Sequence, residues 1–346
     1  MRKLLIILVL IILIATPASA VEFTAPDVPK DVEELMPVET ESFAEGLWKI
    51  VKNAIATLRP DLKDCMGICL SVIAIVVLVS LLRQMPGNSG KIVEIAGVFA
   101  ISLLLLNTAG TMIRLGADTV TELSEYGKLL LPVITGAMAA TGATVSSAAL
   151  YTGTAVFDAV LSALVAKILV PMVYGFLILS IAAAVTGDSM INKLRDLLKG
   201  FMSWALKTVL YIFTGYMGIT GVISGSTDAA ALKAAKLTIA GAVPMVGGIL
   251  SEASEAVLVG AGLAKSAVGV YGLWAVAAIW VSPFLKLGIQ YLLLKLTGTI
   301  CAVFECKTIT GVVGAFTTAM GVLLGMTGAG CFLLLVSVVC FMRGVG

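Results

Sequence analysis

The residues of this chain that could perform chemistry are few, and the most versatile type is missing. There is no histidine among the 346 residues, which removes the commonest general base and the commonest metal ligand. An HExxH metalloprotease motif and a serine–histidine pair are therefore excluded, and the sequence contains no GxxxxGK[ST] phosphate loop. These absences predict a protein that is not an enzyme.

Ionisable residues inside apolar segments are the next candidates, because a charge in a membrane is costly and usually has a function. Asp158 and Lys167 interrupt one such segment, but nine residues separate them, which is too far for a direct pair on one helix. We expect both at the ends of a short interfacial helix. Asp158 and Asp188 are the one carboxylate pair that an aspartyl intramembrane protease could use, and the loop-like TGDS around Asp188 argues against it.

The cysteines indicate packing more than chemistry. All six lie in or next to apolar segments, the usual setting of a small buried hydrophobic residue: Cys65, Cys69, Cys301, Cys306, Cys331 and Cys340. Cys65 and Cys69 share a helix face, but a structural zinc site needs four ligands. Cys301 and Cys306 would supply the other two only if folding brought them close, so no metal and no cofactor are predicted.

A long stretch over residues 226–265 resembles neither a typical membrane span nor a typical loop. Four of its charged residues are placed symmetrically around Pro244. Two lysines lie eight and eleven residues before Pro244, and two glutamates lie at the same distances after it. Proline and paired glycines favour a chain reversal. We therefore predict a broken, re-entrant helical hairpin over residues 226–265, with two separate surface helices as the alternative. Its key residues are Lys233, Lys236, Pro244, Gly247, Gly248, Glu252 and Glu255.

The composition is that of an integral membrane protein. Hydrophobic residues make up 59% of the chain and charged residues 13%, whereas soluble domains have about 25% charged residues. The net charge of +2 predicts no nucleic-acid surface. We predict an all-α fold, a polytopic membrane helical bundle with about six to eight spans.

The N-terminal part is predicted to be exported. Residues 1–20 have a basic start, an apolar core and an Ala-Ser-Ala end, which is the pattern of a signal peptide. We prefer cleavage after Ala20, with an uncleaved signal anchor as the alternative. Residues 21–65 form an acidic extracytoplasmic segment, in which apolar residues at helical spacing over 43–58 predict an amphipathic helix on the outer face.

Residues 66–343 form the predicted polytopic membrane domain. The loop between its first two spans holds Arg83 and Lys91 and no acid, which places that loop in the cytoplasm. We expect an outer connection at 114–128, and 312–342 is too long for one span and short for two. The other predicted spans are 66–82, 92–110, 129–150, one span after a short helix within 154–185, 201–223, 270–285 and 287–300.

Small residues spaced four apart predict close helix packing. Gly221 with Gly225, and Gly321 with Gly325, form GxxxG pairs. Such pairs let helix backbones approach closely in lipid. They favour a compact bundle, and they would also suit a homo-oligomer.

Three stretches of the chain resemble the stage III sporulation protein AE family. They are LLPVITGAMAATGATVSSAAL, the run from LRDLLKGFMSWALK to PMVGGILSEASEAV, and AVGVYGLWAVAAIWVSPFLKLGIQYLLLKLTG. The most specific part is the lysine arm, the PMVGG turn and the SEASEAV arm. The order of signal peptide, acidic outer segment and polytopic region also fits.

The resemblance implies a role that composition cannot show. Members of this family lie in the mother-cell membrane of endospore-forming bacteria, facing the forespore. The implied function is that of a non-enzymatic subunit of a sporulation channel or export complex, partly related to secretion systems, that supports late forespore development. The implied partners are other membrane subunits and the lipid bilayer. The alternative is a small-solute permease with its binding site at the helix broken by Pro244.

Overall fold

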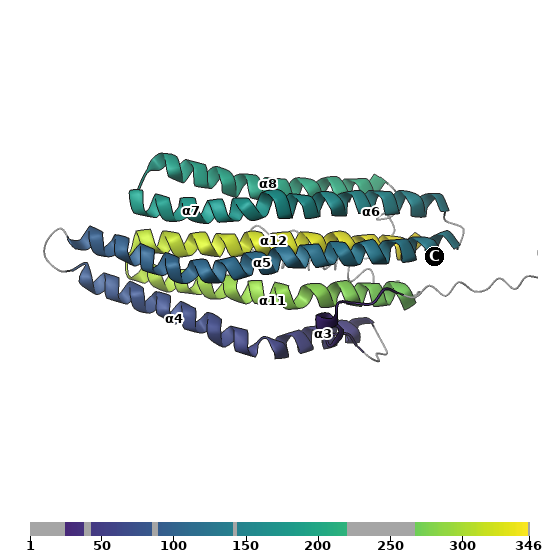
Figure 1. The fold of residues 1–346 in the computed structure, drawn as a ribbon, viewed down its shortest axis with the longest axis horizontal. Coiled ribbons are helices and arrows are strands. Elements are labelled where there is room, and N and C mark those ends of the chain that lie inside the picture. The colour runs from purple at the N-terminus through teal and green to yellow at the C-terminus, as the bar shows by residue number, and fades with distance from the viewer. Residues whose placement is uncertain (1–24, 38–42, 85–88, 141–143, 220–266, 345–346) are drawn as a thin grey trace, which may run out of the picture.

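The structure, a computed structural model, describes residues 25–37, 43–84, 89–140, 144–219 and 267–344. Within these ranges every regular element is helical, and the long helices lie side by side in one elongated bundle (Figure 1). The all-α prediction is confirmed. The elements are α2 (Lys30–Glu33), α3 (Phe43–Thr57), α4 (Arg59–Leu82), α5 (Ser89–Ala140), α6 (Thr144–Leu164), the π-helical turn η1 (Val165–Leu169), α7 (Val170–Thr186), α8 (Ser189–Ile219), α11 (Ala267–Val303) and α12 (Lys307–Gly344).

Several helices are much longer than a membrane is thick. Helix α5 has 52 residues, α12 has 38 and α11 has 37. At about 1.5 Å per residue, α5 is about 78 Å long, whereas the hydrocarbon core of a bilayer is about 30 Å thick. Each of these helices can therefore cross a membrane and continue well beyond it.

Five helices of the described ranges are long and apolar enough to cross a membrane, which confirms a multi-pass membrane protein. They are Leu62–Leu82, Gly90–Ala137, Ala148–Thr186, Val268–Val303 and Lys307–Met342. This number is smaller than the predicted six to eight. Helix α8 covers most of the predicted span 201–223 but is not among the five; Lys193, Arg195 and Lys199 are among the charges of its first half.

Helix α12 forms the centre of the bundle. Of its apolar window, 94% is buried inside the protein, against 28–50% for the other four candidate spans. It packs most closely against α11 and α5 and also contacts α6, α7 and α8. Residues 312–342 looked too long for one span and too short for two. They form part of one helix that is longer than a single span, and other helices cover it along nearly its whole length.

Two predicted breaks between spans are wrong. Residues 92–110, residues 114–128 and the first part of the predicted span 129–150 all belong to the single helix α5, which runs through Pro132 to Ala140. The span 129–150 is wrong as predicted, because its last part, from Thr144, belongs to α6. Residues 270–285 and 287–300 both belong to α11, which runs through Pro283. A proline inside a helix removes one backbone hydrogen bond, and neighbouring helices can support such a site. The charges of 114–128 are tolerated in a helix because Arg114, Asp118 and Glu125 are exposed.

Residues 154–185 are likewise part of one continuous helical segment. The predicted short interfacial helix is wrong, because α6 leads into α7 through η1 without a break. The N–H of Val170 donates to the carbonyl of Val165, five residues back. Pro171 follows directly, and a widened π turn gives its ring the room that a regular α-helix would deny it.

Helix α3 packs across α11. Its buried face includes Phe43, Gly46 and Ile50. The Phe43 and Trp274 rings stack with centroids 6.3 Å apart, and the Trp274 indole N–H donates to the Phe43 carbonyl at 3.2 Å. A Cβ at Gly46 would lie 2.5 Å from the Trp274 ring, so only glycine fits there. The predicted amphipathic helix is present, and its apolar face is covered by protein.

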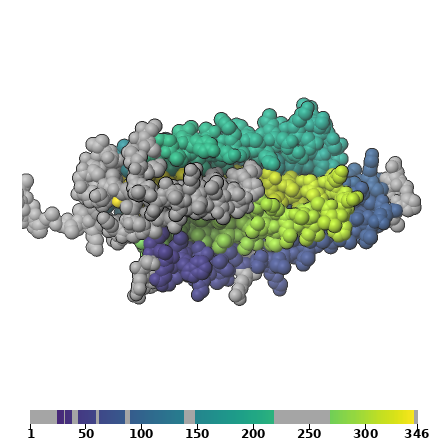
Figure 2. Space-filling model, turned by 180° about the vertical axis from the view of Figure 1, so that it is seen from behind, coloured from purple at the N-terminus to yellow at the C-terminus, as the bar shows by residue number. Residues whose placement is uncertain are grey.

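The end of α4, the start of α5 and the connections α7–α8 and α11–α12 all lie at one end of the bundle, on the left in Figure 1. Seen from behind, α11 lies between α8 above and α3 and α4 below (Figure 2). The predicted signal peptide 1–20 and the predicted hairpin 226–265 lie outside the described residues.

Candidate functional site

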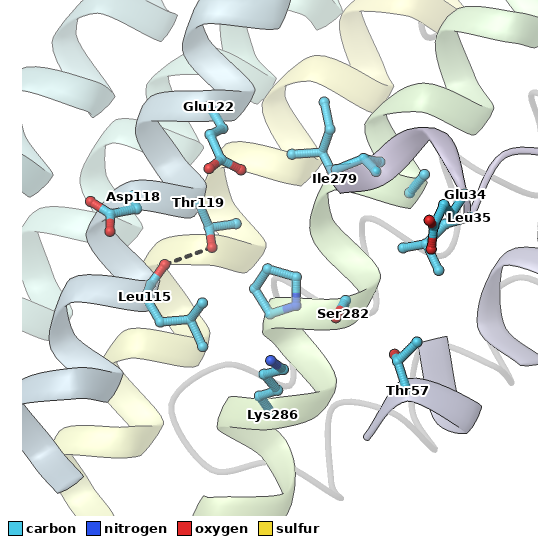
Figure 3. A pocket seen from close by; sticks show the side chains of 13 residues that line it. Glu34, Leu35, Thr57, Leu115, Asp118, Thr119, Glu122, Ile279, Ser282 and Lys286 are labelled. Atoms are coloured by element: carbon cyan, nitrogen blue, oxygen red, sulfur yellow. Dashed lines mark hydrogen bonds between the residues drawn. The ribbon is translucent and has the colours of Figure 1, made fainter. Parts of the chain in front are cut away.

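A polar pocket lies between α5, α11 and the N-terminal segment, about midway along the two long helices. Its volume is about 310 Å³, which is at the small end of the range of ligand pockets. Figure 3 shows Thr119 and Glu122 on the side of α5 toward Ser282 and Lys286 of α11, while the Asp118 carboxylate extends from α5 to the opposite side, at the rim of the pocket. Glu34, Leu35 and Thr57 close a third side. Segments far apart in the sequence therefore build one site.

Helical spacing explains why these side chains converge. On α5, residues 115, 118, 119 and 122 share one face, and on α11 residues 278, 279, 282, 283 and 286 do the same. Pro283 has no N–H, so the carbonyl of Ile279 lacks its usual helical donor at this point. Both residues line the pocket. The hydroxyl of Thr119 donates to the Leu115 carbonyl at 2.7 Å and is thus already engaged within its own helix.

The charges of the pocket suit binding rather than covalent chemistry. Three carboxylates, those of Glu34, Asp118 and Glu122, and one ammonium group, that of Lys286, line it together with three hydroxyls. Among the described residues, no group of three His, Cys, Asp or Glu side chains is arranged to hold a metal ion. The arrangement can accept a small polar solute or a cation.

Sequence reasoning missed this pocket because it assigned its two halves to connections between spans. Asp118 and Glu122 were placed in an outer connection, and Lys286 between two spans. The spacing of Arg114, Asp118 and Glu122 by four residues was the signal that could have shown one helical face.

Asp158 lies inside the bundle, not at an interface. It is 6% exposed, and the hydroxyl of Ser124 on α5 donates to its Oδ2 at 2.6 Å. Lys128 is close enough to interact with the carboxylate electrostatically. One turn away on α6, Thr154 donates to Ser337 of α12 at 3.0 Å. These buried contacts tie α6 to α5 and α12, and they give Asp158 a structural setting.

The structure does not bring Asp158 together with the other predicted charges. Lys167 is exposed in η1, a few turns further along the same helical segment. Asp188 follows Gly187, which ends α7 with a φ of 69°, and its Oδ1 accepts the Met190 N–H at 2.8 Å at the start of α8. The whole of α7 separates Asp188 from Asp158, so an aspartyl pair is not formed.

Three of the cysteines converge at the end of the bundle where α11 turns into α12. All six are buried free thiols. Cys69 of α4 lies beside Thr297 of α11, and Cys301 lies near Cys69 and Cys306. The Arg83 guanidinium donates to the Cys306 sulfur at 3.7 Å.

Of the two predicted GxxxG pairs, only Gly321 with Gly325 lies in the part of the chain that the structure describes. Gly321 and Gly325 are buried on α12, and a Cβ on Gly321 would lie 3.5 Å from the Tyr291 ring of α11. Gly321 therefore lies at a helix contact within the chain, and a role of the pair in a homo-oligomer stays a prediction. Gly221, Gly225 and the seven hairpin residues Lys233, Lys236, Pro244, Gly247, Gly248, Glu252 and Glu255 lie outside the described residues.

Comparison with known proteins gives a match over nearly the whole chain. A family model described as "Stage III sporulation protein AE" matches residues 31–344. A curated relative from Bacillus subtilis (strain 168), also named Stage III sporulation protein AE, is 25% identical over 184 residues, which is 53% of this chain and 46% of the relative. The aligned region thus spans about half the length of that relative. No solved structure matches this chain.

Proposed function

Since the chain belongs to the stage III sporulation protein AE family, we propose that it is a non-enzymatic integral membrane subunit of a sporulation channel or export complex. The complex would link the mother cell with the forespore and would be required for late forespore development. The family match over residues 31–344 carries this proposal, and the five long apolar helices support it. Its partners would be other membrane subunits of the complex and the lipid bilayer.

The distribution of basic residues supports an orientation in the mother-cell membrane. Arg83, Lys91, Lys193 and Lys307 lie at or near the three helix connections that share one end of the bundle. Cytoplasmic loops are enriched in lysine and arginine, so this end would face the mother-cell cytoplasm. Residues 21–65 would then face the forespore.

Helix length supports a role between the two membranes. Because α5 and α12 exceed the thickness of a bilayer, part of the bundle would project from the outer face of the mother-cell membrane. That part would include α3 and α6. A projecting helical surface is what a subunit needs to contact other subunits in the space between the cells.

The orientation leads to a topology prediction. A reporter that is active only outside the cytoplasm should be active when fused near Thr40 and inactive when fused near Asn88. The acidic segment and the signal peptide pattern put the first site outside, and the basic residues beside the second put it inside. Activity near Asn88 would contradict the model at its first crossing.

A second prediction tests the role itself. Deleting the gene in its spore-forming host should leave vegetative growth unchanged and lower the yield of heat-resistant spores by several orders of magnitude. Re-expression of the full chain is the control that should restore the yield. Normal spore numbers in the deletion strain would remove the proposed function.

The runner-up function is a small-solute permease, and one observation favours it. The pocket at Pro283 lies where a long helix loses a backbone hydrogen bond, and broken helices commonly form the substrate sites of transporters. The permease site first considered, at Pro244, lies outside the described residues. A gene next to that of a solute-binding protein would favour the permease, and a run of small membrane-protein genes would favour the complex.

A further inference from the structure

Polar side chains continue from the pocket along one face of α11 into the end of the bundle where α11 turns into α12. The face consists of Ser282, Lys286, Gln290, Leu293, Thr297 and Cys301, at intervals of four, four, three, four and four residues. These are the intervals at which residues share a face of an α-helix. Five of the six are polar or carry a thiol, in a helix that is otherwise mainly apolar. We call these five residues the polar seam.

The seam lies inside the protein and not on a lipid-facing surface. Gln290, Thr297 and Cys301 are all at most 2% exposed. Thr297 and Cys301 lie next to Cys69 of α4, and Ser282 and Lys286 line the pocket opposite α5. The seam therefore runs along the inner side of α11, toward α4 and α5.

Gln290 is a buried amide in the seam whose polar atoms lack hydrogen-bond partners in the described part of the chain. It is 1% exposed, and neither Nε2 nor Oε1 has a hydrogen-bond partner among the described residues. The buried hydroxyl of Ser102 on α5 is in the same situation. Buried amides and hydroxyls without protein partners are normally satisfied by internal water. Water would reach Gln290 most directly from the pocket, which begins one helical turn away at Lys286.

We propose that the polar seam is a water-filled path for small monovalent cations across the membrane, with the pocket as its outer mouth. Three carboxylates against one ammonium group give the mouth an excess of negative charge, which concentrates cations. The carbonyl of Ile279, left without its helical donor by Pro283, adds an oxygen ligand of the kind that hard cations prefer.

The path is closed in this structure at one residue of the face. Leu293 lies between Gln290 and Thr297 and is the only apolar member among the six. An apolar constriction in an otherwise polar pore gates by excluding water. A polar side chain at position 293 therefore opens the path, and an apolar side chain at position 290 closes it.

The inference goes beyond the proposed function and is tested on the purified full-length chain in sealed liposomes. Sodium uptake is followed with a trapped sodium-sensitive dye. Leu293→Ser should raise the uptake rate at least tenfold, and Gln290→Leu added to it should return the rate to that of the unchanged protein. The matched control is Leu292→Ser, the same substitution at the neighbouring residue, which is 62% exposed and lies on another face. Choline, a much larger cation than sodium, should not enter with any variant.

A labelling experiment gives a second readout that does not need the path to open. Gln290→Cys should react with a charged, membrane-impermeant thiol reagent added from the pocket side at least tenfold faster than Ala319→Cys. Ala319 is fully buried on α12, and Lys286→Cys in the pocket is the positive control. The proposal is overturned if Gln290→Cys reacts no faster than Ala319→Cys while Lys286→Cys reacts. It is also overturned if Leu293→Ser passes no more sodium than Leu292→Ser. Neither result would affect the role in sporulation.

Discussion

Replacing Gly97 by leucine should destabilise the bundle where α4 and α5 pack against the central helix α12. Gly97 of α5 lies between α4 and α12, and a Cβ there would come within 2.6 Å of Val79 Cγ2 and 3.1 Å of Ile309 Cδ1. Val79 is β-branched and stiff at χ1, so it cannot turn aside easily. Because three helices meet at this point, a larger side chain must push at least one of them outward.

The expected loss for Gly97→Leu is about 1–3 kcal/mol of unfolding free energy, the range found for overpacked cores. Gly110→Leu on the same helix is the matched control, because a Cβ at Gly110 would meet nothing within 4 Å. That substitution should be neutral within about 0.5 kcal/mol, as is usual away from packed sites. Unfolding of the purified variants in graded detergent mixtures measures both. Equal stability of the two variants would show that α4, α5 and α12 do not meet closely at Gly97.

Asp158→Leu should also destabilise the protein, whereas Asp158→Asn should leave sporulation near normal. Leucine removes the acceptor of the buried Ser124 hydroxyl, and leaving a buried donor unsatisfied costs about 1–3 kcal/mol. Asparagine keeps an acceptor oxygen at nearly the same place. Unfolding free energy and the yield of heat-resistant spores measure the two effects.

A double-mutant cycle separates this contact from general disturbance. Ser124→Ala should cost part of the same free energy, and Asp158→Leu combined with Ser124→Ala should cost less than the sum of the single changes. A separate result would contradict the structural role of Asp158. If Asp158→Asn blocks sporulation while the protein level is unchanged, the carboxylate has a chemical role, such as proton transfer.

The class of the protein and much of its helical content follow from the sequence, because they depend on average hydropathy and on local periodicity. A helix was predicted over 43–58 from apolar residues at helical spacing, and the structure has one at Phe43–Thr57. The turn at Arg83 was predicted from a basic loop without acids. Both features depend only on residues close together in the sequence. They can therefore be predicted without knowing how the other helices pack.

The pocket and the long helices do not follow from the sequence, because they depend on what surrounds each helix. Separate spans were expected on either side of 114–128 and of Lys286, yet α5 runs unbroken through that region and through Pro132, and α11 runs unbroken through Pro283 and Lys286. The acidic residues Asp118 and Glu122 were expected in a loop because a span in lipid would exclude them. In the structure one face of α5 is covered by other helices and another is exposed, so the same helix can carry both kinds of residue.

The burial of α12 has a consequence for how the protein is made. Residues 307–344 leave the ribosome after all the other described helices, yet they form the centre around which α5, α6, α7 and α11 pack. Until they emerge, the earlier helices are already in the membrane with their inner faces uncovered. The earlier helices must therefore stay in the membrane without their central partner until α12 arrives. Synthesis that stopped shortly before residue 307 would leave those helices without the segment that covers their inner faces.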